Sequence, residues 1–156
     1  MLPFKRIVCP TDFSEPALTA LKGAAELARH FGAELIVVHV IPPVPGPLVA
    51  ADPPVATGFD VALYQQELAG YAEKMLKELV SHLVSPEVRT RDRVTTGEAA
   101  PEILRAAAQE RADLIVIATH GLTGWRHLVF GSVAEKVVRQ APCPVLTITA
   151  PAAREG

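Results

Sequence analysis

The sequence predicts an α/β protein: a single doubly wound domain in which a five-stranded, mainly parallel sheet (strand order 3-2-1-4-5) carries helices on both faces. Two observations predict this Rossmann-like architecture. Short apolar runs alternate with segments of helical periodicity, which gives the order βαβαβαβαβ. The strand-like runs are also continuously apolar, as is typical of parallel strands that helices cover on both faces.

The first part of the chain is predicted to form a strand, a helix and a second strand. Residues 6–9 are a short apolar run bounded by a proline, and residues 35–41 are a longer run. Between these two runs, Ser14 suits the N-cap of a helix, and Gly32 suits its end. His39 interrupts the second run, and we expect a core histidine whose polar atoms are satisfied by hydrogen bonds.

The middle of the chain contains a long loop, a long helix and a weaker strand. Prolines at positions 42, 43, 45, 47, 53 and 54 exclude regular structure, so residues 41–58 are predicted to form a loop. An amphipathic pattern from Phe59 onward predicts one long helix, which Pro86 ends. Residues 88–94 are more polar than the other strand-like runs, which predicts a strand near a sheet edge.

The last part of the chain adds two more helix–strand units. A helix is expected after Gly97, followed by a strand at 114–118, a helix at about 132–140 and a final strand at 145–148. The carboxyl ends of parallel strands share one edge of the sheet, and ligands bind there when the strand order reverses. The loops after the first and fourth strands should therefore face each other across a crevice.

Length, composition and charge limit the class of protein. One domain is expected over residues 1–150 with a short tail at 151–156, and an apolar share of 49% can supply its core. A net charge of −2 gives no electrostatic footprint for nucleic acid or an anionic membrane, and no apolar run suits a bilayer. Cys9 and Cys143 lack metal-binding or redox spacing, and no signal peptide is recognisable, so we expect a cytoplasmic protein.

The loop before Ser132 is the strongest candidate for a functional site. A helix that begins at Gly131 and Ser132 offers unpaired amides and a partial positive charge, which suit a phosphate group. Glycine would let the phosphate approach the backbone, and the serine hydroxyl would add a donor. Alternatively, Ser132 and Glu135 form a capping box that occupies the same amides without any ligand.

Other nucleotide-binding and catalytic signatures are absent from the sequence. There is no GxxxxGK[ST] P-loop, and no GxGxxG follows a strand-like run. Asp12, Ser14 and His120 show no recognisable nucleophile–base spacing, and no Cys/His cluster indicates zinc. The residues therefore favour binding over catalysis, and Mg²⁺ or Mn²⁺ would be held by the phosphates of a ligand.

Several stretches, in order along nearly the whole chain, resemble the universal stress protein family. The family's adenine-nucleotide signature is glycine-x2-glycine-x9-glycine-serine, and the chain has Ala118, Gly121 and Gly131–Ser132 at these positions. Further similar stretches lie at residues 5–14, 35–41 and 141–145. The resemblance implies an ATP-binding member that acts as a nucleotide-responsive stress or signalling module, with at most slow ATP hydrolysis.

The resemblance also implies which residues bind ATP, AMP or ADP. Asp12 would accept hydrogen bonds from the ribose, and the helix start at residues 131–133 would hold the phosphates. The complete implied site is Pro10, Thr11, Asp12, Val40, Ile117, Ala118, His120, Gly121, Gly131, Ser132 and Val133. Ala118 replaces the first glycine of the signature, and an alanine fits there if its φ angle is negative.

The final strand is predicted to lie at a sheet edge, where an apolar strand needs a partner. The resemblance implies that residues 144–149 pair with the same segment of a second copy in a homodimer. Two other interpretations stay open. The chain could be a dimeric stress protein that binds no nucleotide, or a slow ATP hydrolase or adenylyl-transfer enzyme.

Overall fold

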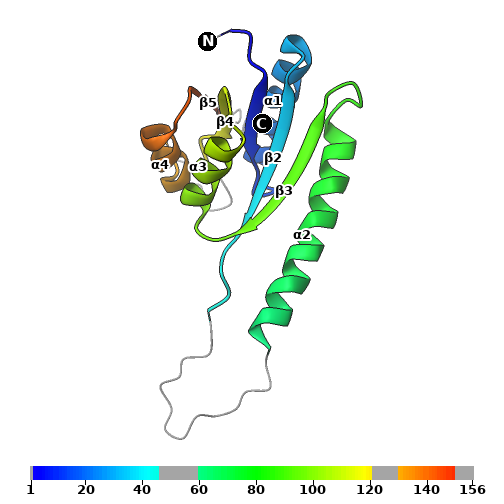
Figure 1. Cartoon of the computed structure of the whole chain (residues 1–156), viewed down its shortest axis with the longest axis vertical. Coiled ribbons are helices and arrows are strands. Elements are labelled where there is room, and N and C mark those ends of the chain that lie inside the picture. The colour runs from blue at the N-terminus through cyan, green and yellow to red at the C-terminus, as the bar shows by residue number, and fades with distance from the viewer. Residues whose placement is uncertain (1, 46–59, 121–129, 150–156) are drawn as a thin grey trace, which may run out of the picture.

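Five parallel strands form one sheet in the computed structural model, which describes residues 2–45, 60–120 and 130–149 (Figure 1). Along the described chain the elements are β1 (Arg6–Pro10), α1 (Glu15–Phe31), β2 (Glu34–Ile41), α2 (Val61–Leu83), β3 (Thr90–Thr96), α3 (Ala99–Gln109), β4 (Leu114–Ala118), α4 (Ser132–Gln140) and β5 (Val145–Ile148). The strand order is β3-β2-β1-β4-β5, and each neighbouring pair is parallel. The predicted fold class and strand order are therefore confirmed.

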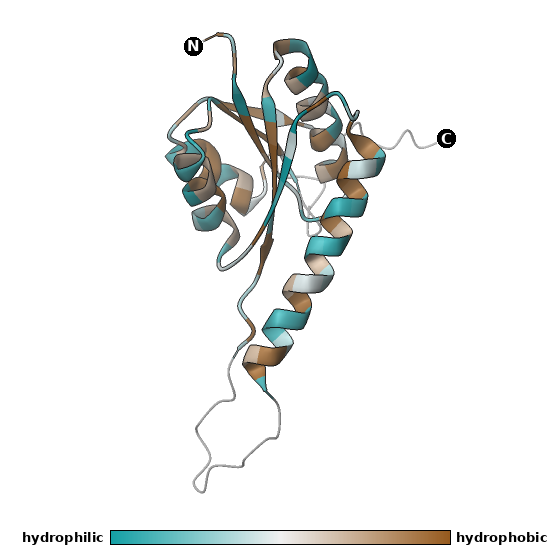
Figure 2. Ribbon diagram, turned by 45° about the vertical axis from the view of Figure 1, so that its right-hand side comes forward, coloured by the Kyte–Doolittle hydropathy of each residue, from teal (hydrophilic) through white to brown (hydrophobic). Residues whose placement is uncertain are grey.

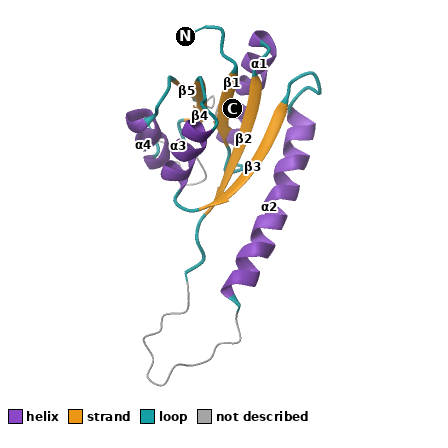
Figure 3. Cartoon of the chain, viewed as in Figure 1, coloured by secondary structure: helices purple, strands orange, loops and turns teal. Residues whose placement is uncertain are grey.

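Helices cover both faces of this sheet, as Figure 3 shows. The core between the sheet and helices α1 and α2 contains Ile7 and Cys9, whereas Val8 packs in the core under α3 and α4. Successive side chains of a strand point to opposite faces, so β1 supplies both cores. Figure 2 shows the same layering in hydropathy, with apolar central strands lying between helices that carry polar outer faces.

Helix α1 begins and ends where the sequence predicts. The Ser14 hydroxyl oxygen accepts the amide of Ala17 at 3.4 Å, and a proline lies in the first turn. Gly32 follows the helix with φ of 65° and donates its amide to the carbonyl of Ala28. This left-handed conformation favours glycine and ends the helix.

Strand β3 differs most from its predicted bounds, which were residues 88–94. Val88 lies in the turn before the strand, where its amide donates to the carbonyl of Ser85 at 3.0 Å. Its side chain is buried in the core beside α1 and α2. The apolar character of Val88 thus reflects packing of a turn, while the predicted edge position of the strand is confirmed.

Helix α2 extends past the carboxyl edge of the sheet (Figure 1). Asp60 caps its start by accepting the amide of Leu63 at 3.0 Å. One turn later, the side chain of Gln65 accepts the amide of Val44 and donates to the hydroxyl of Thr96. These bonds connect the helix start to the segment that follows β2 and to the last residue of β3.

Several expectations fall on residues outside the described part of the chain. They concern most of the loop at 41–58, the tail at 151–156 and Gly121. Within the described ranges, no helix combines the length and apolar character needed to cross a bilayer.

Candidate functional site

A cavity of about 280 Å³ lies at the carboxyl edge of the sheet. The strand order reverses here, because β2 and β3 lie on one side of β1 while β4 and β5 lie on the other. Such a switch point is where doubly wound folds bind ligands. The lining residues are Pro10, Thr11, Asp12, Ala17, Val38, Val40, Ala99, Ile103, Ile117, Ala118, Thr119, His120, Gly131, Ser132, Val133 and Ala134.

Ten of the eleven residues that the sequence implies for the site border this one cavity. They are Pro10, Thr11, Asp12, Val40, Ile117, Ala118, His120, Gly131, Ser132 and Val133. The eleventh, Gly121, lies outside the described residues. The fold thus brings together segments that are more than a hundred residues apart, and the loop after β1 faces the start of α4 as expected.

Asp12 is held by a tight turn between β1 and α1. Its Oδ1 accepts the amide of Ser14 at 3.0 Å and also the hydroxyl hydrogen of Ser14. On the other side of the turn, the amide of Thr11 donates to the carbonyl of Val38 at 2.8 Å and so continues the sheet by one residue. Ser14, not Asp12, caps α1. The carboxylate therefore supports the cap while it borders the cavity.

The start of α4 does not adopt the capping box that Ser132 and Glu135 would suit. Gly131 is the N-cap, with φ of −73° and ψ of 157°, so Ser132 is already the first residue of the helix. The Glu135 carboxylate pairs instead with Arg139 one turn later, at 3.4 Å. The acidic side chain is therefore directed along the helix, away from the N-terminal amides.

Among the described residues, packing does not itself require glycine at position 131. Its φ of −73° suits any residue. A Cβ built there would lie 3.4 Å from the carbonyl oxygen of Thr119 and 3.9 Å from Cα of His120, which are ordinary contacts. The missing side chain instead leaves the backbone of the α4 start open to the cavity that Gly131 borders.

Ala118 ends β4, in register with Ile148 of β5. It is not among the described residues with positive φ, so its extended conformation is one that alanine readily adopts. Its methyl group is buried and borders the cavity. The replacement of the first signature glycine is therefore compatible with the backbone at this position.

Sequence reasoning missed half of the apolar wall of the cavity. Val38 comes from β2, and Ala99 and Ile103 come from the first turns of α3. The sequence predicts a helix after Gly97, but its pattern could not indicate which end of the core Ile103 reaches. Only the sheet topology places the start of α3 beside the carboxyl ends of β1 and β2.

Polar side chains around the cavity are tied to the backbone and to each other. His120 Nδ1 lies 2.9 Å from the hydroxyl of Thr119. His39 lies outside the lining, and its Nδ1 lies 2.9 Å from the carbonyl oxygen of Thr11. The hydrogen bond expected for His39 is thus present, but the side chain is only partly buried and is not part of the core. Among the described residues, no group of three or more His, Cys, Asp or Glu side chains could hold a metal ion.

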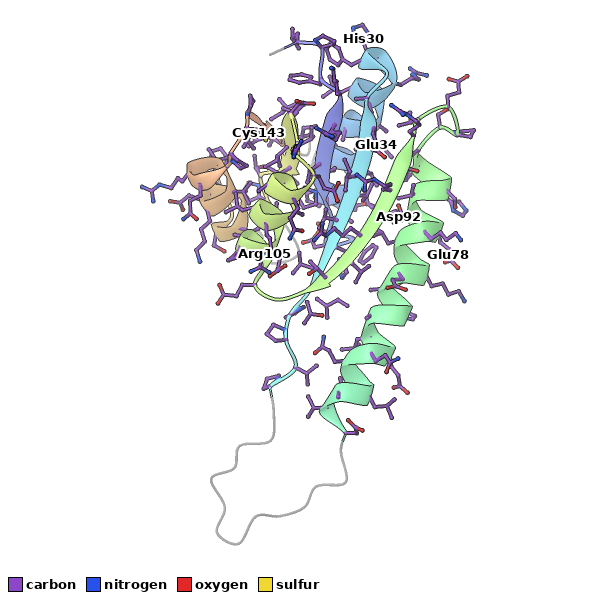
Figure 4. The ribbon with its side chains drawn as sticks, in the orientation of Figure 1. His30, Glu34, Glu78, Asp92, Arg105 and Cys143 are labelled. Atoms are coloured by element: carbon purple, nitrogen blue, oxygen red, sulfur yellow. The ribbon has the colours of Figure 1, made fainter. Side chains whose placement is uncertain are left out.

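Two groups with shifted pKa values lie outside the cavity lining. Burial raises the pKa of Cys9 to about 12, because its thiol lies in the core and a thiolate would lose its hydration there. Burial also raises the pKa of Asp92, against the effect of nearby Lys77. Asp92 lies on β3 beside α2 (Figure 4). The Cys9 shift is a consequence of core packing, whereas Asp92 is an exposed residue of the edge strand that is only partly desolvated.

Comparisons of the chain with a family model and with known proteins agree on one family. The universal stress protein family model matches residues 3–149. A universal stress protein of Thermus aquaticus is 39% identical over 145 residues, which cover 93% of this chain and 98% of that relative. The chain therefore belongs to the universal stress protein family.

Solved structures share the fold over nearly their whole length. The protein MJ0577 of Methanocaldococcus jannaschii superposes with a TM-score of 0.79 at 27% identity, covering 96% of this chain and 98% of its own. A universal stress protein in complex with cAMP has a TM-score of 0.65 at 20% identity, covering 94% and 97%. One from Archaeoglobus fulgidus in complex with dAMP has a TM-score of 0.55 at 23% identity, covering 95% and 99%.

Proposed function

We propose that the chain binds ATP in this cavity and acts as a nucleotide-responsive stress or signalling module. The observation that supports the proposal is the arrangement of Asp12 and the start of α4 around one largely apolar cavity. An adenine nucleotide has the matching parts, namely an apolar base, a sugar with hydroxyl donors and an anionic tail. The volume of about 280 Å³ is near the lower end of ligand pockets, roughly 300–1,000 Å³.

The phosphates are assigned to the start of α4. The first amides of a helix have no intrahelical acceptor, and the helix dipole adds a partial positive charge there. Ser132 offers a hydroxyl donor beside these amides, and Gly131 adds no side chain in front of them. Because Glu135 pairs with Arg139, its charge does not occupy the site. An anion is therefore the ligand that this helix end suits.

The base is assigned to the end of β2. Pairing between β1 and β2 ends at Pro10 and Val38, after which Thr11 turns away. Backbone groups two residues apart point to the same side of a strand, so the amide and carbonyl of Val40 face the cavity beyond this pairing. A neighbouring donor and acceptor match the N1 acceptor and N6 donor of adenine. Guanine presents the opposite pattern at these positions.

The ribose is assigned to Asp12, which borders the same cavity as the apolar wall and the start of α4. An ionised carboxylate is a pure acceptor, and sugar hydroxyls are donors. Mg²⁺ or Mn²⁺ would be held by the phosphates, since the described residues offer no cluster of metal ligands. The relatives in complex with cAMP and dAMP support the proposal, because the same fold accommodates adenine nucleotides in those proteins.

A homodimer is part of the proposal. Strand β5 lies at the sheet edge, and Leu146 on it is 41% exposed. Pairing of residues 144–149 with the same segment of a second copy would cover this edge and bury the exposed leucine. The assembly would leave the cavity of each copy at the carboxyl edge of its own sheet.

Calorimetric titration of the purified chain with ATP and with GTP tests the proposed ligand. We expect ATP to bind and GTP to bind more weakly. Ser132→Ala should weaken ATP roughly tenfold to a hundredfold, the effect of one hydrogen bond to a charged group. Gly131→Glu should abolish binding through bulk and charge. No heat of ATP binding by the wild type, or equal affinities of the wild type and both variants, would contradict the proposed site.

The same preparations separate the two alternatives. Chromatography of the small molecules released by denaturation identifies any co-purified nucleotide, and a protein that neither carries nor binds one would be a nucleotide-free dimer. Multiple-turnover release of phosphate or pyrophosphate, lost in Asp12→Ala, would instead identify an enzyme. We expect bound adenine nucleotide and at most slow turnover.

A further inference from the structure

We infer that His39, which lies outside the cavity, is a positioning residue that sets how Asp12 meets the sugar of the nucleotide. The inference rests on the proposed function and adds a residue to it. His39 is in β2, between Val38 and Val40, which both border the cavity. Side chains alternate along a strand, so His39 points to the other face of the sheet. It therefore acts from the face of the sheet opposite Val38 and Val40.

One hydrogen bond joins His39 to the turn that carries Asp12. Its Nδ1 lies 2.9 Å from the carbonyl oxygen of Thr11, the residue that immediately precedes Asp12. A carbonyl only accepts, so Nδ1 carries the hydrogen and donates it. The amide of Thr11 donates to Val38 in turn. Both polar backbone groups of Thr11 are thus anchored to β2.

The residue after Asp12 is held from the same direction. Phe13 has φ of 65°, a left-handed conformation that a bulky side chain rarely adopts. Its ring packs on the imidazole of His39 with centroids 4.5 Å apart and planes tilted by 44°. Its amide donates to the hydroxyl of Thr11 at 3.1 Å. A strained conformation persists only where its surroundings hold it, and the Phe13 side chain is held by His39 and by the core beside α1 and α2.

These contacts fix the backbone on both sides of Asp12. His39 bonds to the residue before it and packs on the residue after it, while Ser14 bonds to the carboxylate itself. Loss of the His39 donor would release the Thr11 carbonyl and let the turn relax. The carboxylate would then shift relative to the sugar, whereas the apolar wall and the start of α4 would stay in place.

The test uses a matched pair of amide substitutions. In His39→Asn the amide nitrogen occupies nearly the position of Nδ1 and can donate to Thr11. In His39→Gln it lies one bond further out, near the position of Nε2, and cannot reach the same carbonyl in the same way. Affinities for ATP, 2′-deoxyATP and 3′-deoxyATP are measured for both variants, the wild type and Asp12→Asn, and thermal unfolding checks that each variant is folded.

We expect the wild type to prefer ATP over at least one deoxy analogue and Asp12→Asn to lose that preference. His39→Gln should weaken ATP binding about fivefold to tenfold and reduce the ratio of ATP affinity to deoxy-analogue affinity by a similar factor. His39→Asn should bind ATP and the analogues as the wild type does. Equal weakening of ATP and the deoxy analogues by His39→Gln, or no weakening, would overturn the inference while the proposed function stands. If the wild type bound no ATP, both the proposed function and the inference about His39 would be contradicted.

Discussion

Ser14 donates its hydroxyl hydrogen to the carboxylate of Asp12 and accepts the amide hydrogen of Ala17 through the same oxygen. One side chain thus joins the cap of α1 to a residue that borders the cavity. The Ser14 hydroxyl oxygen therefore contributes both to the stability of α1 and to the orientation of the Asp12 carboxylate. A substitution at this position should affect both properties, and the two effects can be separated.

Ser14→Ala should lower the free energy of unfolding by about 1 kcal/mol, the usual effect of losing an N-cap oxygen. It should also weaken ATP binding, because Asp12 loses the hydroxyl that holds its Oδ1, while the bond from the Ser14 amide remains. Urea denaturation and calorimetric titration of the same preparation measure the two effects.

Ser14→Asp is the matched control for this prediction. An aspartate also caps helices well, so stability should be largely kept. Its negative charge would lie beside the carboxylate of Asp12, so ATP binding should still weaken. If Ser14→Asp bound ATP as tightly as the wild type, the bond between Ser14 and Asp12 would have no bearing on the site.

Elements with local signals were predicted best from the sequence. Ser14 and Gly32 mark the ends of α1 by cap chemistry alone, and the structure places the helix between them. The strand at 114–118 and the helix at 132–140 also have their predicted bounds. Local cap and hydrophobicity signals are sufficient in these places because no distant contact competes with them.

Features that depend on distant contacts were not predictable in the same way. Ala99 and Ile103 border the cavity because the topology brings the start of α3 to it, and nothing near them in the sequence indicates this. The choice between the capping box and an open helix end at Ser132 depended on a shift of one residue in the helix start. In the structure Gly131 is the N-cap, and its amide donates to the Thr119 carbonyl at 2.7 Å.

Gly131→Ser separates the stability of α4 from ligand binding. Serine is a good N-cap, and the space beside Thr119 accepts a Cβ, so the free energy of unfolding should stay equal or rise by a few tenths of a kcal/mol. The new side chain would bond to the amides that we assign to the phosphates. ATP should therefore bind at least about tenfold more weakly in calorimetric titration.

Adenosine is the control ligand for Gly131→Ser. It lacks phosphates, so its affinity should be the same for the variant and the wild type. A parallel loss of adenosine and ATP affinity would mean that the substitution disturbs the whole cavity and that the phosphates are not specifically affected.

Leu146→Lys should convert the proposed dimer to a monomer, as measured by sedimentation or by light scattering after size exclusion. Leu146 is 41% exposed on the edge strand β5, and a lysine there would place two like charges in the paired edge. Tyr71→Lys is the matched control, since Tyr71 is 66% exposed on α2. Helix α2 lies beside β3, at the edge of the sheet opposite β5 (Figure 1). If Leu146→Lys stayed dimeric, the interface would lie elsewhere.

Cys9 should make the stability of the fold depend on pH above 9. Burial raises the pKa of its thiol from an ordinary value of 9.0 to about 12. The buried thiol thus keeps its proton where the unfolded chain loses it. Its contribution is fully present below pH 9 and is lost as the pH rises toward 12, by about 1.4 kcal/mol for each pH unit. Urea denaturation at several pH values measures the slope.

Cys9→Ala provides the reference, because other groups also titrate in this range. The alanine variant should be less stable at neutral pH, since it leaves a small cavity beside Ile7 and Leu35 in the core. Its stability should fall less steeply above pH 9, so the difference between the two proteins should shrink as the pH rises. Parallel pH profiles would show that the thiol titrates alike in the folded and unfolded chains, against the burial that the structure gives it.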